Sequence, residues 1–414
     1  MDKVILGEGY YLEDDTGLTR PNNNQIIVGS SGTGKSVSVM LPTILNMHES
    51  SMIGTYSKAG DVRRISEYQK SMGYISEICD LTNPENSTVS FEPLSYISSD
   101  LDIENLSKSI ILADPDSKNP KDIYWNDAAT SLLSAFIAIV LITEDEPTMN
   151  KVLDLFDSLK IEEYGKGITT TLDDFFSLTA SSVDSSELEG FNDFLQLPYA
   201  TAGCVRDSLA KAFRRLFPDT VRKMMREHSS IDFKSIATRK TSLIIITSPV
   251  NKSLYLFANL LFSTAIKELV EFAEICDSHR LPIPVRLMFD DFACAAKIND
   301  FAGYISIFRA SGISAMMLLQ SESQLESVYS AEEATTILDN CSCYVYFPGG
   351  MNLKTCRNIS QRLDTPIADI MYAPMQKVII MQSGRKPSTV RRYDTFHSPE
   401  YLRYMKISQK SHER

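Results

Sequence analysis

The chain has 414 residues, of which 43% are hydrophobic and 23% charged, with a net charge of −12 and an isoelectric point of about 5.0. This composition supports one large or two moderate hydrophobic cores, and its acidity excludes a protein that binds nucleic acid over its whole surface. The seven cysteines include no C-x-x-C pair and the five histidines are scattered, which argues against a disulfide framework and a zinc site.

The first residues, MDKVILGEGYYLEDD, are acidic and lack the apolar segment of a signal peptide. The longest apolar run, residues 132–142, is too short to span a bilayer and predicts a buried helix. We therefore expect a cytoplasmic protein without a transmembrane segment of its own.

Short apolar runs rich in β-branched residues alternate with helical segments in the first and last parts of the chain. Helices are expected over residues 35–46 and 62–72. This alternation predicts an α/β fold with a mostly parallel central sheet covered on both faces. The predicted strands, in chain order, are QIIVG, SMIGTY, YISEIC, SLIIIT, VRLMF, ISAMMLL, CSCYVYF and KVIIMQ.

The middle of the chain differs, because strand signals fade and helical periodicity dominates. Residues 97–203 contain 20 acidic and 6 basic residues, a net charge of −14. We expect an all-α insertion domain over residues 97–238, placed inside a nucleotide-binding α/β domain formed by residues 1–96 and 239–414.

Two segments are basic. Residues 204–227 contain seven basic and three acidic residues, and residues 377–414 contain nine basic and three acidic residues. They are either ordinary solvated faces or local surfaces for nucleic acid or a partner. The sequence favours neither interpretation.

The segment GSSGTGKS matches the phosphate-loop pattern G-x-x-x-x-G-K-[ST], and it lies between a predicted strand and a predicted helix. The loop's N–H groups and the helix terminus would bind a phosphate, Lys35 would reach the terminal phosphates, and Ser36 would ligate Mg²⁺. Pro42 is expected to kink the helix. The alternative is a purely structural β–α turn. The predicted nucleotide-binding residues are Gly29, Ser30, Ser31, Gly32, Thr33, Gly34, Lys35 and Ser36.

Two adjacent carboxylates, Asp290 and Asp291, end the predicted strand VRLMF. At the carboxyl edge of a parallel sheet they would lie beside the phosphate loop. Asp290 would hold Mg²⁺, and Asp291 would orient or deprotonate the attacking water. Alternatively, the pair is only the polar end of a core strand.

Two further polar residues follow. Gln320 ends the next predicted strand, where it can hydrogen-bond a γ-phosphate; otherwise it caps a helix. Arg309 lies between the two strands and could reach a neighbouring subunit's nucleotide as an arginine finger, or it forms a surface ion pair.

Taken together, these motifs resemble the type IV coupling proteins, the TraG-type conjugative ATPases of the FtsK-like branch of RecA-fold motors. The similar stretches occur in the family's order, from near residue 5 to about residue 395. They are IIVGSSGTGKSVSVMLPTIL, YWNDAATSLLSAFIAIVL, the segment from LPIPVRLMFDDFACAAKI to DNCSCYVYF, and NISQRL.

The resemblance implies a RecA-like domain with an all-α insertion, which forms a hexameric ring when active and could be monomeric in isolation. It implies ATP and Mg²⁺ as nucleotide and metal, and sequence-independent transfer of single-stranded DNA, usually with a bound relaxase, to a type IV secretion channel. Position by position, it assigns Lys35 and Ser36 to phosphate and Mg²⁺, Asp290 and Asp291 to the acidic pair, Arg309 to the family's arginine and Gln320 to its sensor glutamine.

Three departures accompany the resemblance. The family's second acid is Glu, whereas this chain has Asp291; its DPKGE stretch is TYSKAGD, of which Lys58 and Gly60 keep the pattern; and its NPL is EPL, with Glu92 in place of Asn. Family members usually begin with transmembrane helices, so we expect either a removed anchor or a separate membrane partner that recruits the protein to the cytoplasmic face of the membrane. The departures predict slow turnover.

Three functions are compatible with these features. The first is an ATP-driven motor for DNA or a relaxase–DNA complex, whose acidic insertion docks a basic relaxase or accessory protein. The second is a nucleotide-controlled adaptor that recruits cargo with little or no turnover. The third, a small-molecule kinase, lacks a compact lid segment in the sequence.

Overall fold

The computed structural model describes residues 2–13, 21–56, 59–113, 123–181, 186–248, 250–251, 253–294 and 297–412. The chain divides into two compact units. We call the first the α/β unit (Met1–Cys79, Asp232–Pro249 and Ala265–Arg414) and the second the helical unit (Asp80–Ile231 and Val250–Thr264). The domain limits expected at residues 97 and 238 stay a prediction.

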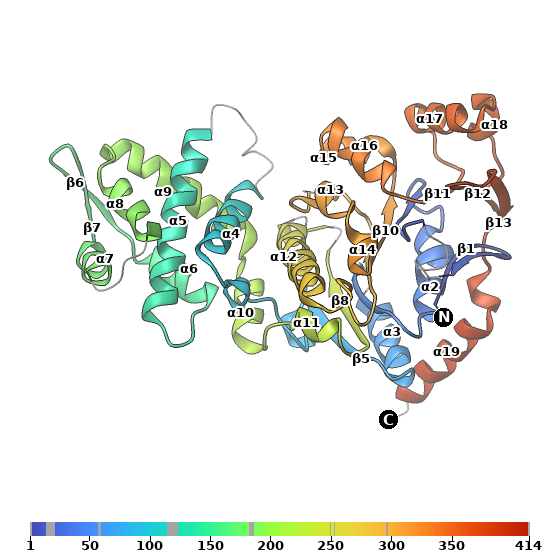
Figure 1. Ribbon diagram of the computed structural model, residues 1–414, viewed down its shortest axis with the longest axis horizontal. Coiled ribbons are helices and arrows are strands. Elements are labelled where there is room, and N and C mark those ends of the chain that lie inside the picture. The colour runs from blue at the N-terminus through green and yellow to red at the C-terminus, as the bar shows by residue number, and fades with distance from the viewer. Residues whose placement is uncertain are drawn as a thin grey trace. The chain divides into compact units, whose positions relative to one another are not determined.

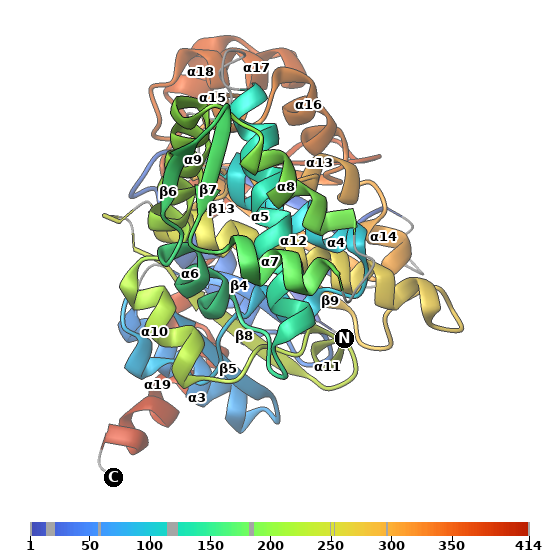
Figure 2. The ribbon, with the colours of Figure 1, turned by 90° about the vertical axis from the view of Figure 1, so that its left-hand side faces the viewer.

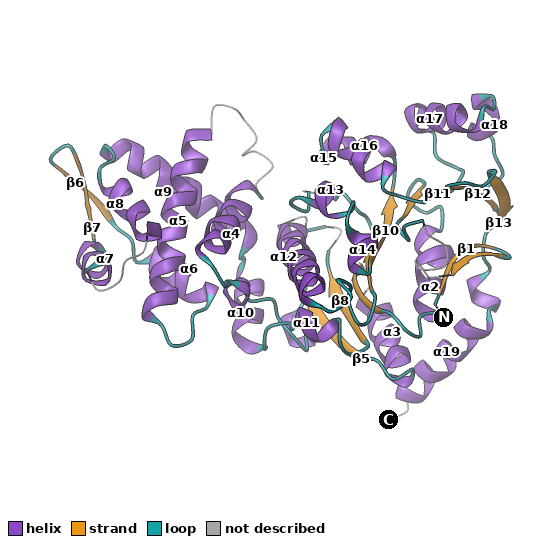
Figure 3. Cartoon of the chain, viewed as in Figure 1, coloured by secondary structure: helices purple, strands orange, loops and turns teal. Residues whose placement is uncertain are grey.

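A nine-stranded sheet, drawn among the orange strands of Figure 3, forms the centre of the α/β unit. Its strand order is β13-β12-β11-β3-β10-β9-β4-β8-β5. Each of the eight predicted strands is present in it. The bounds are β3 Gln25–Val28, β4 Ser51–Tyr56, β5 Ile75–Asp80, β8 Thr241–Ile246, β9 Val285–Phe289, β10 Ile313–Leu319, β11 Cys343–Tyr346, β12 Lys377–Gln382 and β13 Ser388–Arg391.

Parallel pairing joins β11, β3, β10, β9, β4 and β8. Every residue of these six strands is buried, as expected for nearly continuous apolar strands covered on both faces. At one edge, β12 pairs antiparallel with both β11 and β13. The predicted α/β fold with a mostly parallel central sheet is confirmed.

Helices cover this sheet, and a two-stranded hairpin, β1 (Lys3–Gly7) with β2 (Tyr10–Glu13), precedes it. The hairpin is one element that the sequence analysis did not predict. The helices are α2 Leu41–Leu45, α3 Ala59–Ser71, α11 Phe233–Ile236, α13 Phe301–Tyr304, α14 Phe308–Ser311, α15 Glu322–Val328, α16 Ala331–Asp339, α17 Leu353–Leu363, α18 Ile367–Met371 and α19 Pro399–His412, with α12, Ser253–Ile275, shared between the units.

The described part of the basic segment 377–414, which ends at residue 412, is folded. It supplies β12, β13 and α19, and α19 lies beside α3 (Figure 1). The rings of Tyr404 and Tyr68 meet edge to face with centroids 6.1 Å apart, and both side chains are buried. Tyr404 of this segment therefore belongs to the core of the α/β unit.

The helical unit packs its helices around phenylalanine side chains. The ring of Phe136 meets those of Phe156, Phe176 and Phe191 with centroids 5.5 to 6.4 Å apart, a spacing that favours aromatic contact. The helices are α4 Asp100–Leu112, α5 Ile123–Thr143, α6 Met149–Asp157, α7 Asp173–Ala180, α8 Glu189–Leu195, α9 Tyr199–Leu216 and α10 Asp219–Glu227.

One hairpin interrupts this helical architecture. Strands β6 (Ile161–Tyr164) and β7 (Gly167–Thr170) pair antiparallel, and they lie beside α8 and α9 (Figure 2). Gly165 lies in the turn with φ +61°, a conformation that favours glycine. The segment expected to be all-α therefore also contains a small two-stranded sheet.

Two helices, α5 and α12, are long and apolar enough to cross a membrane by length and composition. In the most apolar stretch of each helix, 56% of the residues in α5 and 72% of those in α12 are buried inside the fold. This burial is typical of the core helices of a folded domain. The apolar run at residues 132–142, predicted to be a buried helix, lies within α5.

Candidate functional site

The segment Gly29–Ser36 forms a tight loop directly after β3. The Gly29 N–H donates to the carbonyl of Leu319 at 3.1 Å, so the loop starts against the end of the neighbouring strand β10. The Thr33 hydroxyl donates to the Ser30 carbonyl at 2.7 Å. Gly34 has φ +88°, a region that side chains disfavour, so glycine is needed there. The loop is thus closed by its own hydrogen bonds.

Lys35 lies inside this loop and is buried. Its ammonium group donates to the carbonyls of Gly29, at 2.5 Å, and Ser30, at 3.1 Å. Burial lowers the pKa of Lys35, while the nearby carboxylates of Asp291 and Asp290 act in the opposite direction. The lysine and both carboxylates therefore share one electrostatic environment.

The helix after the loop does not begin as a regular α-helix. Residues Ser36–Met40 form a π-helical segment, in which the Leu41 N–H donates to the Ser36 carbonyl, and α2 follows. Pro42 lies in the first turn of α2, where a proline is tolerated because its N–H would have no helical partner. The kink expected at Pro42 stays a prediction. The π-helical segment was not predicted, and such segments are frequent at functional sites.

Asp290 follows β9 and lies against the start of this helix. The Ser36 hydroxyl donates to Asp290 Oδ1 at 2.7 Å, across 254 positions of sequence. The Asp290 N–H donates to the hydroxyl of Thr55, the residue before the last of β4, at 3.1 Å. Sequence analysis placed Asp290 beside the loop because it ends a strand of a parallel sheet, but it did not identify Thr55, whose position depends on the neighbouring strand.

Asp291 and Ala293 have a strained backbone. Their φ angles are +67° and +59°, in the left-handed region that aspartate tolerates better than alanine does. The half-buried Asp291 carboxylate makes no hydrogen bond to another described residue. Strain of this kind often accompanies functional sites.

Gln320 directly follows β10 and lies one residue beyond the carbonyl that accepts the Gly29 N–H. Its side chain is exposed, and its backbone N–H donates to Gln324 Oε1 at 3.0 Å. The Gln324 amide in turn makes a long, 3.5 Å contact with the Ala293 carbonyl. Gln324, which the sequence analysis missed, therefore links the turn after β10 to the segment after the acidic pair.

A buried carboxylate, Glu322, begins α15 directly after the same turn. Glu322 is 2% exposed, and it accepts hydrogen bonds from Tyr344 on β11 at 2.8 Å and from Arg362 on α17 at 2.6 Å. The Asn358 amide donates to its other oxygen at 2.5 Å. Because a buried charge needs such partners, Glu322 ties α15, β11 and α17 together.

Arg309 does not join this group. It lies on α14, which ends two residues before the start of β10, whereas the phosphate loop and Gln320 lie at the other end of the parallel strands. Its side chain is exposed, and its carbonyl accepts a hydrogen bond from Arg280 at 3.0 Å. Within one chain, Arg309 and the phosphate loop are thus at opposite edges of the sheet.

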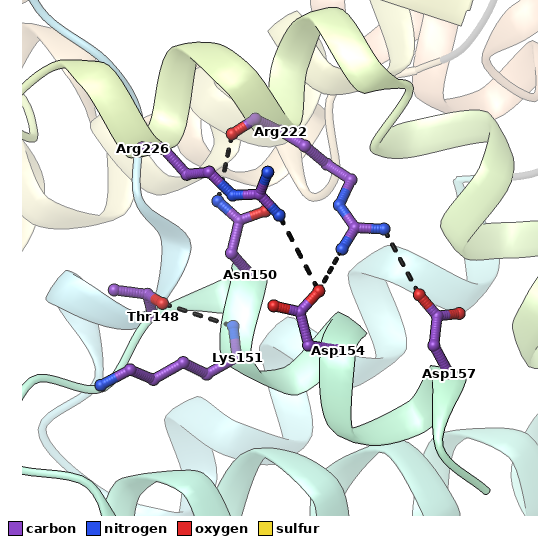
Figure 4. Close-up of polar contacts among 7 residues, drawn as sticks. All are labelled: Thr148, Asn150, Lys151, Asp154, Asp157, Arg222 and Arg226. Atoms are coloured by element: carbon purple, nitrogen blue, oxygen red, sulfur yellow. Dashed lines mark hydrogen bonds and ion pairs between the residues drawn. The ribbon is translucent and has the colours of Figure 1, made fainter.

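The basic segment 204–227 is partly neutralised inside the helical unit. Figure 4 shows Arg222 and Arg226 of α10 directed toward Asp154 and Asp157 of α6. Arg222 pairs with both aspartates and Arg226 with Asp154, while the Asn150 amide donates to the Arg222 carbonyl at 3.1 Å. The end of this segment therefore holds two helices together, which favours a structural role for these residues.

The other two departures from the family pattern are the TYSKAGD stretch and Glu92. In the first, Lys58 lies outside the described residues. Glu92 is buried in the helical unit, where it accepts hydrogen bonds from the Leu94 N–H at 3.2 Å and the Met149 N–H at 2.7 Å. Burial raises the pKa of Glu92 to about 7, and these two donors act against the shift. Glu92 thus makes its contacts within the helical unit.

Comparisons with known proteins identify the family and the fold. A family model described as type IV secretory system conjugative DNA transfer matches residues 3–365. No curated protein matches the chain at a significant level.

Solved structures of similar fold extend over most of the chain. The plasmid coupling protein TrwB in complex with ADP and Mg²⁺ has a TM-score of 0.67 at 17% identity, covering 91% of this chain and 88% of that one. The bacterial conjugative coupling protein TrwBdeltaN70 in complex with sulphate has a TM-score of 0.66 at 17% identity, covering 89% of this chain and 85% of that one. VirB4 of Thermoanaerobacter pseudethanolicus has a TM-score of 0.60 at 13% identity, covering 97% of this chain and 98% of that one. At these identities the similarity establishes the fold, a RecA-like α/β domain with a helical part.

Proposed function

The chain belongs to the type IV secretory system conjugative DNA transfer family, and we propose that it is an ATP-dependent coupling protein that delivers DNA or a relaxase–DNA complex to a type IV secretion channel. The observation that carries this proposal is the hydrogen bond between Ser36 and Asp290. It brings the end of the phosphate loop and the acidic strand end, which are far apart in sequence, to one point. This is the arrangement that a phosphate-loop ATPase needs.

The nucleotide we propose is ATP with Mg²⁺. The Ser36 hydroxyl and the Asp290 carboxylate, 2.7 Å apart, are the oxygen ligands that Mg²⁺ prefers. Among the described residues, no group of three or more His, Cys, Asp or Glu side chains could hold a metal alone. This fits a metal held jointly by one or two protein oxygens and nucleotide phosphates. TrwB, with the same fold, is known in complex with ADP and Mg²⁺.

The residues divide the work as follows. The loop N–H groups of Gly29–Ser36 hold the phosphates, and Lys35 leaves its carbonyl partners to reach the terminal phosphates. Asp291 orients or deprotonates the attacking water, and Gln320 hydrogen-bonds the terminal phosphate. When bound, Mg²⁺ neutralises charge on the phosphate oxygens. The strained turn at Asp291 and the Gln324 link would pass the loss of that phosphate to the segment between β9 and β10.

A steady-state ATPase assay tests the proposal. We expect ATP hydrolysis that single-stranded DNA stimulates and that Lys35→Ala abolishes. Lys166→Ala, at an exposed position in the hairpin of the helical unit, serves as a control for non-specific effects of substitution. Turnover that is equal in the unaltered chain and in Lys35→Ala would exclude the motor.

Ring formation gives Arg309 a role in trans. We propose a hexamer in which this exposed arginine reaches the nucleotide of the neighbouring subunit. Lys35→Ala and Arg309→Ala should each be inactive alone. When mixed, some interfaces combine an intact loop with an intact arginine, so activity should partly return. No recovery in stable mixed rings would place Arg309 outside catalysis.

The helical unit is proposed as the docking surface for a basic relaxase or accessory protein. The exposed hairpin residues Glu162, Glu163 and Tyr164 present two carboxylates and an aromatic ring, Tyr164 being 73% exposed. Reversing the charge with Glu162→Lys and Glu163→Lys should abolish partner binding and leave DNA binding intact. A loss of DNA binding instead would contradict the assignment. We further propose that a membrane partner recruits the protein to the cytoplasmic face of the membrane.

A second function is favoured by one observation, the strained Asp291, whose carboxylate makes no hydrogen bond to another described residue. In this alternative the protein is a nucleotide-controlled adaptor that recruits cargo with little turnover. Tight ATP binding without DNA-stimulated hydrolysis would support the adaptor over the motor.

A further inference from the structure

Arg392 lies against the phosphate loop, although it is 357 residues away in sequence from Lys35. It follows β13, and its backbone N–H donates to the Gln376 carbonyl at 2.9 Å. Its guanidinium Nη1 lies 3.2 Å from the point where a Cβ on Gly34 would be. Gly34 immediately precedes Lys35, so this cation borders the space in which the loop would hold phosphate.

The guanidinium has hydrogen-bonding capacity that the protein does not use. Its Nε and Nη2 atoms are buried and have no hydrogen-bond partner, and no carboxylate of a described residue pairs with it. Buried polar groups are normally satisfied, and leaving a charged one unpaired is costly. Burial also lowers the pKa of Arg392. Such a donor set is expected where an external acceptor completes it.

The position of this side chain is fixed by the surrounding structure. The guanidinium lies over the ring of Phe347, 5.4 Å from the centroid. Three residues further on, the Thr395 hydroxyl donates at 2.5 Å to the carbonyl of Val37, in the π-helical segment after the loop. Arg392 is therefore held between the sheet and the start of the loop helix, and it is oriented before any ligand binds.

We propose that Arg392 is a further phosphate-binding residue, which donates to phosphate oxygens of the nucleotide on its own chain's loop. Arginine suits this role because its planar fork matches phosphate oxygens in two parallel hydrogen bonds. The proposal rests on the proposed binding of nucleotide and adds a contact from the carboxyl-terminal segment. Because Thr395 and α19 follow directly, nucleotide binding would also tighten this segment on the loop helix.

Nucleotide titration of the full chain tests the assignment. In Arg392→Gln, we expect ADP to bind at least about tenfold more weakly, which is the usual loss for a hydrogen bond to a charged group. Adenosine, which has no phosphate, should bind equally to both proteins. Arg392→Lys keeps the cation over Phe347 but loses the fork, so its ADP affinity should be intermediate. Arg391→Gln is the matched control, since Arg391 is the exposed neighbour, and it should bind ADP normally.

The outcomes separate this inference from the proposed function. If Lys35→Ala and Arg392→Gln both bind ADP as the unaltered chain does, the nucleotide site itself is wrong. If only Lys35→Ala loses ADP, the site stands and the Arg392 contact is wrong. If ADP and adenosine weaken equally in Arg392→Gln, the side chain acts on the fold and not on phosphate. Should Arg392→Gln fail to fold, unchanged ADP affinity in a folded Arg392→Lys would also overturn the fork contact.

Discussion

Charged side chains serve different ends in the two units. At the phosphate loop of the α/β unit, Lys35 donates only to carbonyls of its own loop, and Arg392 keeps two donor atoms without a partner. In the helical unit, Arg222 and Arg226 are paired with the aspartates of a neighbouring helix. At the phosphate loop these donors have no carboxylate partner among the described residues, whereas on α10 the arginines form ion pairs within the fold.

This difference shows why charge counts are a poor guide to function. Residues 204–227 have a net charge of +4, yet part of that charge is compensated inside the helical unit. Arg392 belongs to the other basic segment, and its importance comes from its distance to Gly34 and not from the number of basic neighbours. The following predictions test the comparison, in order of expected effect.

Lys35→Ala should have the largest effect. Removing the ammonium group takes away a preorganised positive charge from the phosphate site, so ATP turnover should fall on the order of 100- to 1,000-fold. A coupled ATPase assay measures it. Lys166→Ala, which removes an exposed lysine from the hairpin of the helical unit, should leave turnover unchanged. Equal losses in both variants would refute the contrast between the units.

Glu92→Gln should change how the stability of the helical unit depends on pH. In the folded state the carboxyl has a pKa of about 7, against 4.5 for an ordinary one. Between these values the folded state holds a proton that the unfolded chain has released, so stability falls as pH rises through this window. The variant should lose this slope and should be more stable at pH 8, on the order of 3 kcal/mol.

Urea unfolding at pH 5 and pH 8 measures this change. The single tryptophan, Trp125, lies on α5, so its fluorescence reports on the helical unit. The same slope in Glu92→Gln and in the unaltered chain would show that another group is responsible.

Asp291→Glu should raise the rate of ATP hydrolysis, by about tenfold. The carboxylate would reach about 1.5 Å further, and positioning errors of order 1 Å are costly to rate. The melting temperature should fall, because glutamate tolerates φ +67° less well than aspartate. Asp291→Asn should remain folded and hydrolyse more slowly. Unchanged or slower hydrolysis in Asp291→Glu would mean that the site is built around aspartate.

Arg222→Gln and Arg214→Gln should have the smallest effects, and they compare a paired arginine of α10 with an exposed arginine of α9. Arg222 pairs with two aspartates, so its loss should lower the free energy of unfolding by about 1 kcal/mol without changing DNA affinity. Arg214 is exposed on α9, and its loss should weaken DNA binding. The slope of the logarithm of DNA affinity against the logarithm of salt concentration should become shallower by about one. Urea unfolding and fluorescence anisotropy at two salt concentrations separate the effects. The reverse pattern would show that α10, and not α9, contacts DNA.

Much of the α/β unit was predictable, because its strands are apolar runs of β-branched residues and its loop has a local signature. The placement of Asp290 near Ser36 was predictable too, since parallel strands end at one edge. The hairpin β6–β7 was missed because its strands are short and largely polar, and β1–β2 was missed because its strands have only five and four residues. Thr55, Gln324 and Arg392 were missed because each acts through a partner on another element.

The sequence by itself therefore determined the family, most strands of the central sheet and the residues of the phosphate loop, because these depend on short-range patterns of apolar, glycine and acidic residues. Only the tertiary structure decided which basic side chains are paired with carboxylates and which keep unused hydrogen-bond donors. Arg222 and Arg392 are both arginines in basic segments. Arg222 of α10 forms an ion pair with Asp154 of α6, whereas Arg392 lies beside Gly34 and has two N–H groups without a hydrogen-bond partner. Electrostatic pairing depends on distances in space, which no local pattern contains.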